Sequence, residues 1–164
     1  MERNQYRHRR INISAVAIVA GLLLLQATTF SFQLSHNIGD AMEPTLRDAQ
    51  RIVINHAIYR LRAPRPGDVV SLYYPIDPNT SFVRRVIARE GDTIRISGGK
   101  VYVNGTALDE RYVDRNPSDR TDWGPQIVPA GYYFVLGDNR NGSSDSRHWG
   151  YVPRRYIIGK VIAG

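Results

Sequence analysis

Apolar residues are arranged in two contrasting ways along this chain. From Ile11 to Phe32 they follow no strand or helix-face period, and the stretch carries no charged residue. A helix of this length rises about 1.5 Å per residue and would cross roughly 30 Å, the thickness of a bilayer's hydrocarbon core. The pattern therefore predicts a transmembrane helix over residues 11–32.

The residues before this stretch predict its direction. Arg3, Arg7, Arg9 and Arg10 stand against a single acid, Glu2. The positive-inside rule then makes residues 1–10 a basic cytoplasmic tail and places residues 33–164 outside, in a single-pass protein of the cell membrane. A cleavable signal peptide is the alternative, but the apolar stretch is long and no Ala-x-Ala site closes it cleanly.

Beyond residue 32 the pattern changes to short runs rich in Val, Ile and Tyr, separated by Gly, Pro, Asn and Asp. Such runs are typical of half-buried strands. We expect strands at Arg51–Asn55, Asp68–Tyr74, Phe82–Arg89, Thr93–Ser97, Lys100–Val103, Tyr132–Leu136 and Tyr156–Ile162. Gly98-Gly99 predicts a hairpin turn and Ile58–Arg62 one helical turn, whereas Leu108–Gln126 resembles a polar excursion outside the core. The pattern indicates an all-β domain, a barrel or sandwich of short strands, over residues 33–164.

Composition narrows the possible functions. The 164 residues include no cysteine, which excludes disulfides and thiolate metal sites, and no Asp or His pair shows metal-ligand spacing, so we expect no metal and no cofactor. The net charge of +7 comes almost wholly from arginine, since Lys100 and Lys160 are the only lysines. The charge fits an anionic lipid bilayer better than nucleic acid, because no basic helix or aromatic-interleaved motif accompanies it.

Three motifs carry the candidate chemistry. Residues 39–46 read Gly-Asp-Ala-Met-Glu-Pro-Thr-Leu, and residues 82–87 read Phe-Val-Arg-Arg-Val-Ile and are followed by Gly91-Asp92. Residues 137–153 read Gly-Asp-Asn-Arg-Asn-Gly-Ser-Ser-Asp-Ser-Arg-His-Trp-Gly-Tyr-Val-Pro. In this order, and after a membrane anchor, they resemble the motifs of type I signal peptidases, the membrane serine endopeptidases that remove signal peptides from exported preproteins. The resemblance covers nearly the whole chain and implies a signal-peptidase-like β domain.

The resemblance implies a catalytic serine and a neutral lysine that serves as its base, but neither residue is present. Ala41 stands at the serine position and Arg84 at the lysine position. An alanine methyl group has no oxygen with which to attack a carbonyl. A guanidinium is not deprotonated in proteins, so it cannot accept the proton. We therefore expect that this chain does not cleave peptides.

Other site residues follow from the same resemblance. Ser143 is implied as a hydrogen-bond partner of the base, and Asp145 and Arg147 as an ion pair that holds the loop behind the dyad. His56 and His148 are the other conceivable bases, yet neither stands at the lysine's motif position. We assign His148 a structural or surface role.

The family's substrate is an extended signal peptide that adds to the strand before the lysine, here Ser81-Phe82-Val83, while small apolar pockets accept its alanine side chains. The positions matched to those pockets are Ile38, Met42, Leu46, Phe82 and Val83. Pocket walls and core residues look alike in sequence, so these residues are equally compatible with the core. Signal peptides of exported preproteins are the expected partners, and the secretion translocon is a further candidate.

Three interpretations remain at this level. The chain is a signal peptidase whose serine and lysine were deliberately replaced, or a natural pseudoprotease that acts as a binding or assembly factor in protein export, or a membrane-anchored β domain with structural duties only. The density of the motif at residues 137–153 disfavours the third. The chain's preference for arginine favours a natural Arg84, whereas the otherwise intact site favours a recent replacement.

Overall fold

The computed structural model describes residues 14, 16–21, 31–113 and 121–163. The chain divides into two compact units, residues 1–31 and residues 32–164. In the first, Ser14 and residues 16–21 are helical. The predicted cytoplasmic tail and most of the predicted transmembrane helix lie outside the described residues. Within the described part of the chain, no helix is both long and apolar enough to cross a bilayer.

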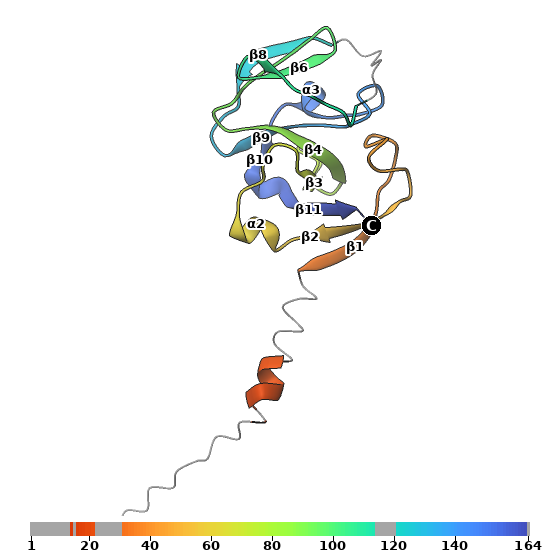
Figure 1. The fold of residues 1–164 in the computed structure, drawn as a ribbon, viewed down its shortest axis with the longest axis vertical. Helices are drawn as coiled ribbons and strands as arrows, with labels where there is room; N and C mark the ends of the chain where they lie inside the picture. The colour runs from red at the N-terminus through yellow and green to blue at the C-terminus, as the bar shows by residue number, and fades with distance from the viewer. Residues whose placement is uncertain (1–13, 15, 22–30, 114–120, 164) are drawn as a thin grey trace, which may run out of the picture. The chain divides into compact units, whose positions relative to one another are not determined.

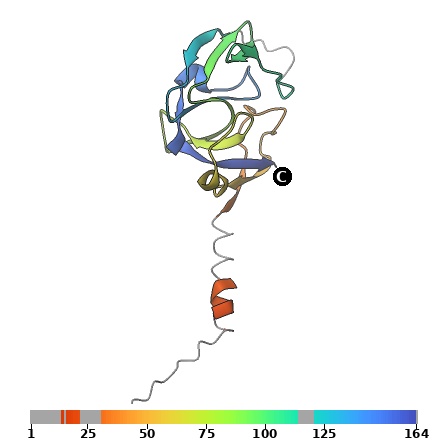
Figure 2. The same ribbon diagram turned by 60° about the vertical axis from the view of Figure 1, so that its left-hand side comes forward.

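Within residues 32–113 and 121–163, eleven strands form two antiparallel sheets (Figures 1 and 2). The seven-stranded sheet has the order β1 (Phe32–His36), β2 (Arg51–Asn55), β11 (Ile157–Ala163), β3 (Val69–Tyr73), β4 (Ser81–Arg89), β9 (Tyr132–Leu136) and β10 (Val152–Pro153). The four-stranded sheet has the order β7 (Thr106–Ala107), β6 (Lys100–Val103), β5 (Thr93–Ser97) and β8 (Trp123–Ile127). Three single turns of helix connect them: α2 (Ile58–Leu61), α3 (Ser146–Trp149) and η1 (Arg154–Tyr156).

An all-β domain was predicted and a mostly β domain is observed, with three short helical turns; the seven predicted strands lie within one residue of observed ones. The predicted hairpin turn is also confirmed. Ser97 pairs with Lys100, and Gly98 and Gly99 between them have φ values of 58° and 79°. Glycine adopts this left-handed conformation without the steric penalty that other residues meet, which explains the two adjacent glycines.

The sequence did not reveal every element. The expectation that Leu108–Gln126 is only an excursion is wrong at its end, because β8 pairs with β5 through Thr93↔Ile127 and Ile96↔Trp123. A glycine and a proline inside β8 hide its strand character, since both are rare in strands. The edge strand β1 was also missed, because it is short and four of its five residues are exposed. Its first residue, Phe32, was wrongly assigned to the end of the predicted transmembrane helix.

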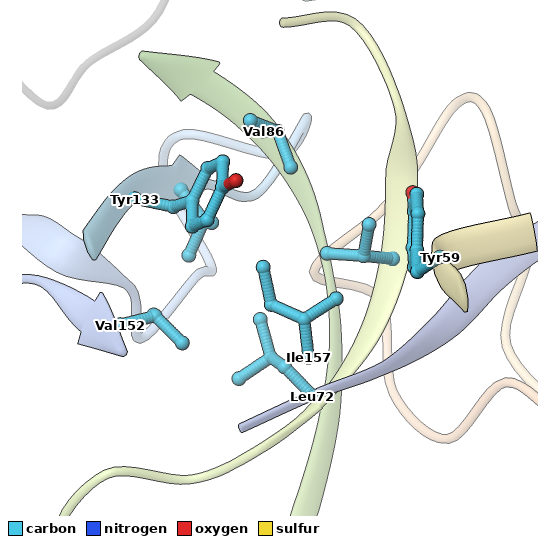
Figure 3. Close-up of a cluster of buried hydrophobic side chains, with 8 residues drawn as sticks. Tyr59, Leu72, Val86, Tyr133, Val152 and Ile157 are labelled. Atoms are coloured by element: carbon cyan, nitrogen blue, oxygen red, sulfur yellow. The ribbon is translucent and has the colours of Figure 1, made fainter. Parts of the chain in front are cut away.

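Three clusters of buried side chains form the core. The first cluster packs α2 against strands of the seven-stranded sheet, namely β3, β4, β9, β10 and β11. It comprises Tyr59, Val70, Leu72, Val86, Tyr133, Val135, Val152 and Ile157 (Figure 3). The second joins the two sheets and comprises Ile87, Ala88, Ile94, Ile96, Val101, Val128, Phe134 and Leu136. Strand β9 supplies alternate residues to both clusters, as the two-residue period of a strand requires. It is therefore buried on both faces.

The third cluster fixes the long loop between β1 and β2. Met42 and Leu46 from this loop are fully buried against Ile52 and Ile54 of β2 and Val161 of β11. Burying two large apolar side chains stabilises the loop by about 3–6 kcal/mol in transfer free energy. The loop is therefore part of the folded core rather than a flexible connection.

Asp68 ties α2 to the seven-stranded sheet. Its carboxylate is 7% exposed and accepts hydrogen bonds from Tyr59, from the Arg62 guanidinium, from the backbone N–H of Arg65 and from Lys160 Nζ at 2.8 Å. Burial by itself raises the pKa of this carboxyl, but the hydrogen bonds from Arg62, Lys160 and Arg65 outweigh it and hold the pKa well below its usual range. The carboxylate is thus charged throughout the neutral range.

The Asp68 cluster predicts a stability that falls in acid. A carboxyl with a lowered folded-state pKa stabilises the fold above its unfolded pKa of about 3.9, and this contribution is lost as the pH falls through the folded pKa. Asp68→Asn should lower the free energy of unfolding at pH 7 by about 1 kcal/mol or more and weaken the loss below pH 4. Urea unfolding at pH 7, 4 and 3, followed by tryptophan fluorescence, measures both effects.

Asp109→Asn is the matched control, because the Asp109–Arg111 pair is exposed and such pairs contribute little. If Asp68→Asn lost as much unfolding free energy below pH 4 as the unmodified protein does, Asp68 would not be the source of the acid sensitivity.

Candidate functional site

Ala41 lies in the β1–β2 loop, which polar contacts close upon itself. Asn37 Nδ2 donates to the carbonyls of Gly39 at 3.0 Å and Arg47 at 2.9 Å, and the Gly39 N–H donates to Asp48 Oδ1 at 2.7 Å. Asn37 is buried, so its two bonds are shielded from competing water, whereas the Gly39–Asp48 bond is exposed. Together with the buried Met42, they give Ala41 a fixed position.

Arg84 lies in the middle of β4 and is 5% exposed. Its Nε and Nη2 both donate to the Ser144 carbonyl, at 2.9 and 2.7 Å, and Nη1 donates to the Val83 carbonyl at 2.6 Å. The guanidinium also lies over the Phe82 ring, 4.7 Å from its centroid. The side chain is thus held in one orientation by contacts on three sides.

Arg84 remains a cation at neutral pH. Burial lowers the pKa of its guanidinium to about 10, the nearby Asp145 opposes this, and the like charge of Arg147 adds to it. A group with that pKa is protonated in all but about one molecule in a thousand at pH 7. It is therefore a hydrogen-bond donor and not a proton acceptor.

Three buried ion pairs involve residues of the motifs that contain Arg84 and the loop after β9. Asp145 accepts two hydrogen bonds from the Arg147 guanidinium, both at 2.8 Å, and a third from the Gly137 N–H. In the second pair Arg85 binds both oxygens of Asp138, and in the third Arg140 binds both oxygens of Glu110. Bidentate pairs of this kind fix direction as well as distance. The Arg85–Asp138 pair holds the loop after β9 against β4, and the Arg140–Glu110 pair holds it to the segment after β7.

A pocket of about 210 Å³ opens beside Ala41 and Arg84. Of the predicted substrate-binding residues, Ile38, Phe82 and Val83 line it, and Ile38 is 93% exposed at its rim. Met42 and Leu46 do not line it, because both side chains are fully buried in the third core cluster. For these two residues the structure agrees with the core alternative.

The sequence did not identify the rest of the pocket wall. Besides Ser81 of the predicted peptide-binding strand, it comes from four strands and the start of the loop: Gln33, Ser35, His36, Asn37, Ile52, Ile54, Ser71 and Ile158. Ser71 is buried and lies opposite Val83 in the β3–β4 register. These residues are distant in sequence and meet only through strand pairing, so no local motif could have indicated them.

Two strands with an unpaired edge line this pocket. Strand β4 pairs with β3 along Ser81–Arg85, but its pairing with β9 begins only at Arg85. Among the described residues, no strand pairs with the other edge of residues 81–84. Strand β1 ends the sheet order, so one of its edges is also unpaired. Unpaired backbone N–H and C=O groups of this kind are a template for an added strand.

Comparisons with known proteins decide the family. A family model described as "Signal peptidase, peptidase S26" matches residues 10–163. This chain belongs to that family. Signal peptidase I of Leptolyngbya laminosa is 38% identical over 149 residues, covering 86% of this chain and 72% of the relative. Probable signal peptidase I-2 of Synechocystis sp. is 38% identical over 158 residues, covering 93% and 71%.

The signal peptidase family also appears among solved structures. The crystal structure of a signal peptidase I from Enterococcus faecalis V583 matches with a TM-score of 0.52 and 29% sequence identity. The match covers 62% of this chain and 98% of that chain. The curled antiparallel sheets described above are therefore a signal peptidase I-like fold.

Within this signal peptidase fold, the β1–β2 loop and the loop after β9 are in close contact at Gly137. A Cβ atom added there would lie 2.2 Å from Ser143 Oγ and 2.5 Å from the Ala41 carbonyl oxygen. The Asn139 N–H donates to the same Ala41 oxygen at 3.1 Å. Only glycine lets the loops approach this closely. Ser143 thus lies directly behind Ala41, and its buried Oγ has no hydrogen-bond partner among the described residues.

The two histidines lie away from the reactive positions of this signal peptidase fold. His148 is exposed at the end of α3, where its Nδ1 accepts the Asp145 N–H in a capping box, at 3.5 Å. His56 contacts the Ile158 carbonyl and the Gln33 side chain. Among the described residues, no group of three or more His, Cys, Asp or Glu side chains has the geometry to hold a metal ion.

The close contact at Gly137 predicts that a methyl group added at this position destabilises the fold. Gly137→Ala should lower the free energy of unfolding by about 1–3 kcal/mol, because the added carbon overlaps both Ser143 and the Ala41 carbonyl. The double variant Gly137→Ala/Ser143→Gly should recover only part of this, since the carbonyl overlap remains. Urea unfolding of both variants measures the difference.

Gly98→Ala is the control, because its added carbon has open space and only its backbone, at φ +58°, is strained. A Gly137→Ala protein as stable as the unmodified one would show that the two loops separate at no cost.

Proposed function

We propose that this protein is a membrane-anchored signal peptidase homologue that binds signal peptides of exported preproteins without cleaving them. The observation that carries the proposal is the pair of residues at the reactive positions. Ala41 and Arg84 line one pocket, and the two side chains supply a methyl group and a guanidinium where the family resemblance implies a nucleophile and a base. Acyl transfer by the serine–lysine route lacks both of its reacting groups.

No other residue of the pocket supplies the missing chemistry. Ser35, Ser71, Ser81 and His36 also line it. Activation of a serine requires a base within hydrogen-bonding reach. Among the described residues, no hydrogen bond joins any of these serines to His36 or to another basic side chain. The hydroxyl groups of the pocket are therefore available for binding but are not activated.

The features that bind a peptide are present. The open edge of residues 81–84 offers backbone donors and acceptors to an extended chain, as in β-augmentation. The pocket beside it is lined by Val83, Ile52 and Ile54 and has a volume of about 210 Å³, which suits small apolar side chains. Such a site selects extended segments with small residues at alternate positions.

The membrane location remains part of this proposal. It is supported by the uncharged stretch of residues 11–32, the basic residues before it, and the helical, exposed state of Val16, Ile18 and Val19. An N-terminus in the cytoplasm then places residues 33–164 outside, where signal peptides emerge. The translocon is a candidate neighbour for the same reason.

A natural pseudoprotease is favoured over a deliberately inactivated enzyme by the way Arg84 fits. Its guanidinium makes three hydrogen bonds to two carbonyl oxygens and lies over an aromatic ring. Three of its five N–H donors thus have acceptors at positions that suit a planar guanidinium, which favours a site adapted to arginine. We therefore propose a binding or assembly role in protein export.

Restoring both reacting groups tests the proposal. The double variant Ala41→Ser/Arg84→Lys should cleave a preprotein after an Ala-x-Ala site, because the serine supplies the oxygen and burial lowers the pKa of the new lysine as it lowers that of Arg84. The unpartnered Ser143 Oγ offers that lysine an acceptor. Mass spectrometry of the released peptide measures cleavage.

The single variants are the matched controls. Arg84→Lys alone should release no product, and Ala41→Ser alone should be slower than the double variant by about 100-fold or more. The unmodified protein should bind the preprotein and leave it intact. Product released by the unmodified protein would contradict the proposal, and a folded but inactive double variant would show that more than the dyad has been lost.

A further inference from the structure

Arg84 is the one buried cation of the site without an acid of its own in the described part of the chain. The other buried charges of the site are three acids and three arginines, paired as Asp138–Arg85, Glu110–Arg140 and Asp145–Arg147. Among the described residues Arg84 makes no ion pair within 4.0 Å, and its partners are carbonyl oxygens. Within the described part of the site, Arg84 is therefore the positive charge left without an acid partner, and it borders the pocket.

The hydrogen bonds of Arg84 show how many of its donors remain for an anion. A guanidinium has five N–H donors. Three of these donors are in use. Two of them, on Nε and Nη2, donate to the same Ser144 oxygen, so they lie on the edge of the guanidinium that contains Nε. One N–H remains on each of the two terminal nitrogens. Two N–H groups on one plane match the two oxygens of a carboxylate.

We propose that the pocket recognises the free C-terminal carboxylate of a peptide that ends in small residues, with Arg84 as its bidentate partner. This rests on the proposed function, because it takes the open edge of residues 81–84 as the peptide's binding strand. The ligand is thus a signal peptide that another peptidase has already released. An intact preprotein continues past this point and presents an uncharged amide instead.

The neighbouring residues accommodate such an end group. Ala41 lines the same pocket as Arg84, and its methyl group occupies less space than a hydroxymethyl group. A peptide paired with residues 81–84 that stops beside Arg84 brings its carboxylate to the guanidinium. A buried charge without a partner is unfavourable, so binding would relieve a cost already present in the free protein. The chain then acts as a receptor for the product of signal peptide cleavage.

The test uses the full chain in detergent micelles and three synthetic peptides of one sequence ending in Ala-x-Ala. The first has a free carboxylate, the second a C-terminal amide, and the third continues for three residues. Fluorescence anisotropy should give a dissociation constant for the carboxylate about tenfold or more below those of the other two, as expected of a charge-assisted bidentate contact.

Arg84→Met should abolish this preference while leaving binding of the amide peptide. Arg84→Lys should keep part of the carboxylate preference, because an ammonium group is still a positive charge. This variant replaces Arg84→Met in the test if the methionine variant does not fold. Arg95→Met is the matched control, because Arg95 is exposed in the four-stranded sheet. It should preserve the preference in full.

Each outcome separates the two proposals. Equal affinity for carboxylate and amide overturns carboxylate recognition but leaves peptide binding intact. Failure of all three peptides to bind overturns the proposed function itself. A carboxylate preference that survives in the folded Arg84→Met protein overturns the assignment to Arg84.

Discussion

The buried Arg85–Asp138 pair joins all three motifs of the site. Arg85 comes from β4, Asp138 follows β9, and Thr45 of the first loop donates its hydroxyl hydrogen to Asp138. A buried pair of this kind contributes modest net stability, since desolvation offsets much of the attraction, but the loss of one partner is severe. The main effect of the pair is on geometry, because its hydrogen bonds fix the relative positions of three segments that are far apart in sequence. Two of these segments, the first loop and β4, supply Ala41 and Arg84 to the pocket.

The neighbouring residues Arg84 and Arg85 have different roles, one at the pocket and the other in the framework that holds it. Successive residues of a strand point to opposite faces, so adjacent arginines enter different surroundings. Arg85 meets a carboxylate and holds the framework, whereas Arg84 meets carbonyl oxygens and retains spare donors. The framework does not depend on the chemistry of the pocket. This separation explains how the fold remains intact when neither reacting group is present.

Much of the fold followed from sequence, and less of the site did. Strands rich in Val, Ile and Tyr were predictable because at least one face of each is buried, whereas most residues of β1 and β8 are exposed. Ala41, Arg84, Ser143, Asp145 and Arg147 were assigned from motif resemblance, and the structure shows that the last three lie behind the pocket rather than on its wall. Pocket and core could not be separated for Met42, since both environments select the same apolar residues.

The four-stranded sheet is inserted between two strands that pair directly with each other. Strands β4 and β9 are neighbours, yet residues 90–131 lie between them in the sequence. Such an insertion is usually free to change length, but this one reaches back to the site. Glu110 holds Arg140, and the Tyr112 ring lies 4.0 Å from Arg85. A shorter insertion would remove this acid and this aromatic ring, so the length of the segment and the composition of the site depend on each other.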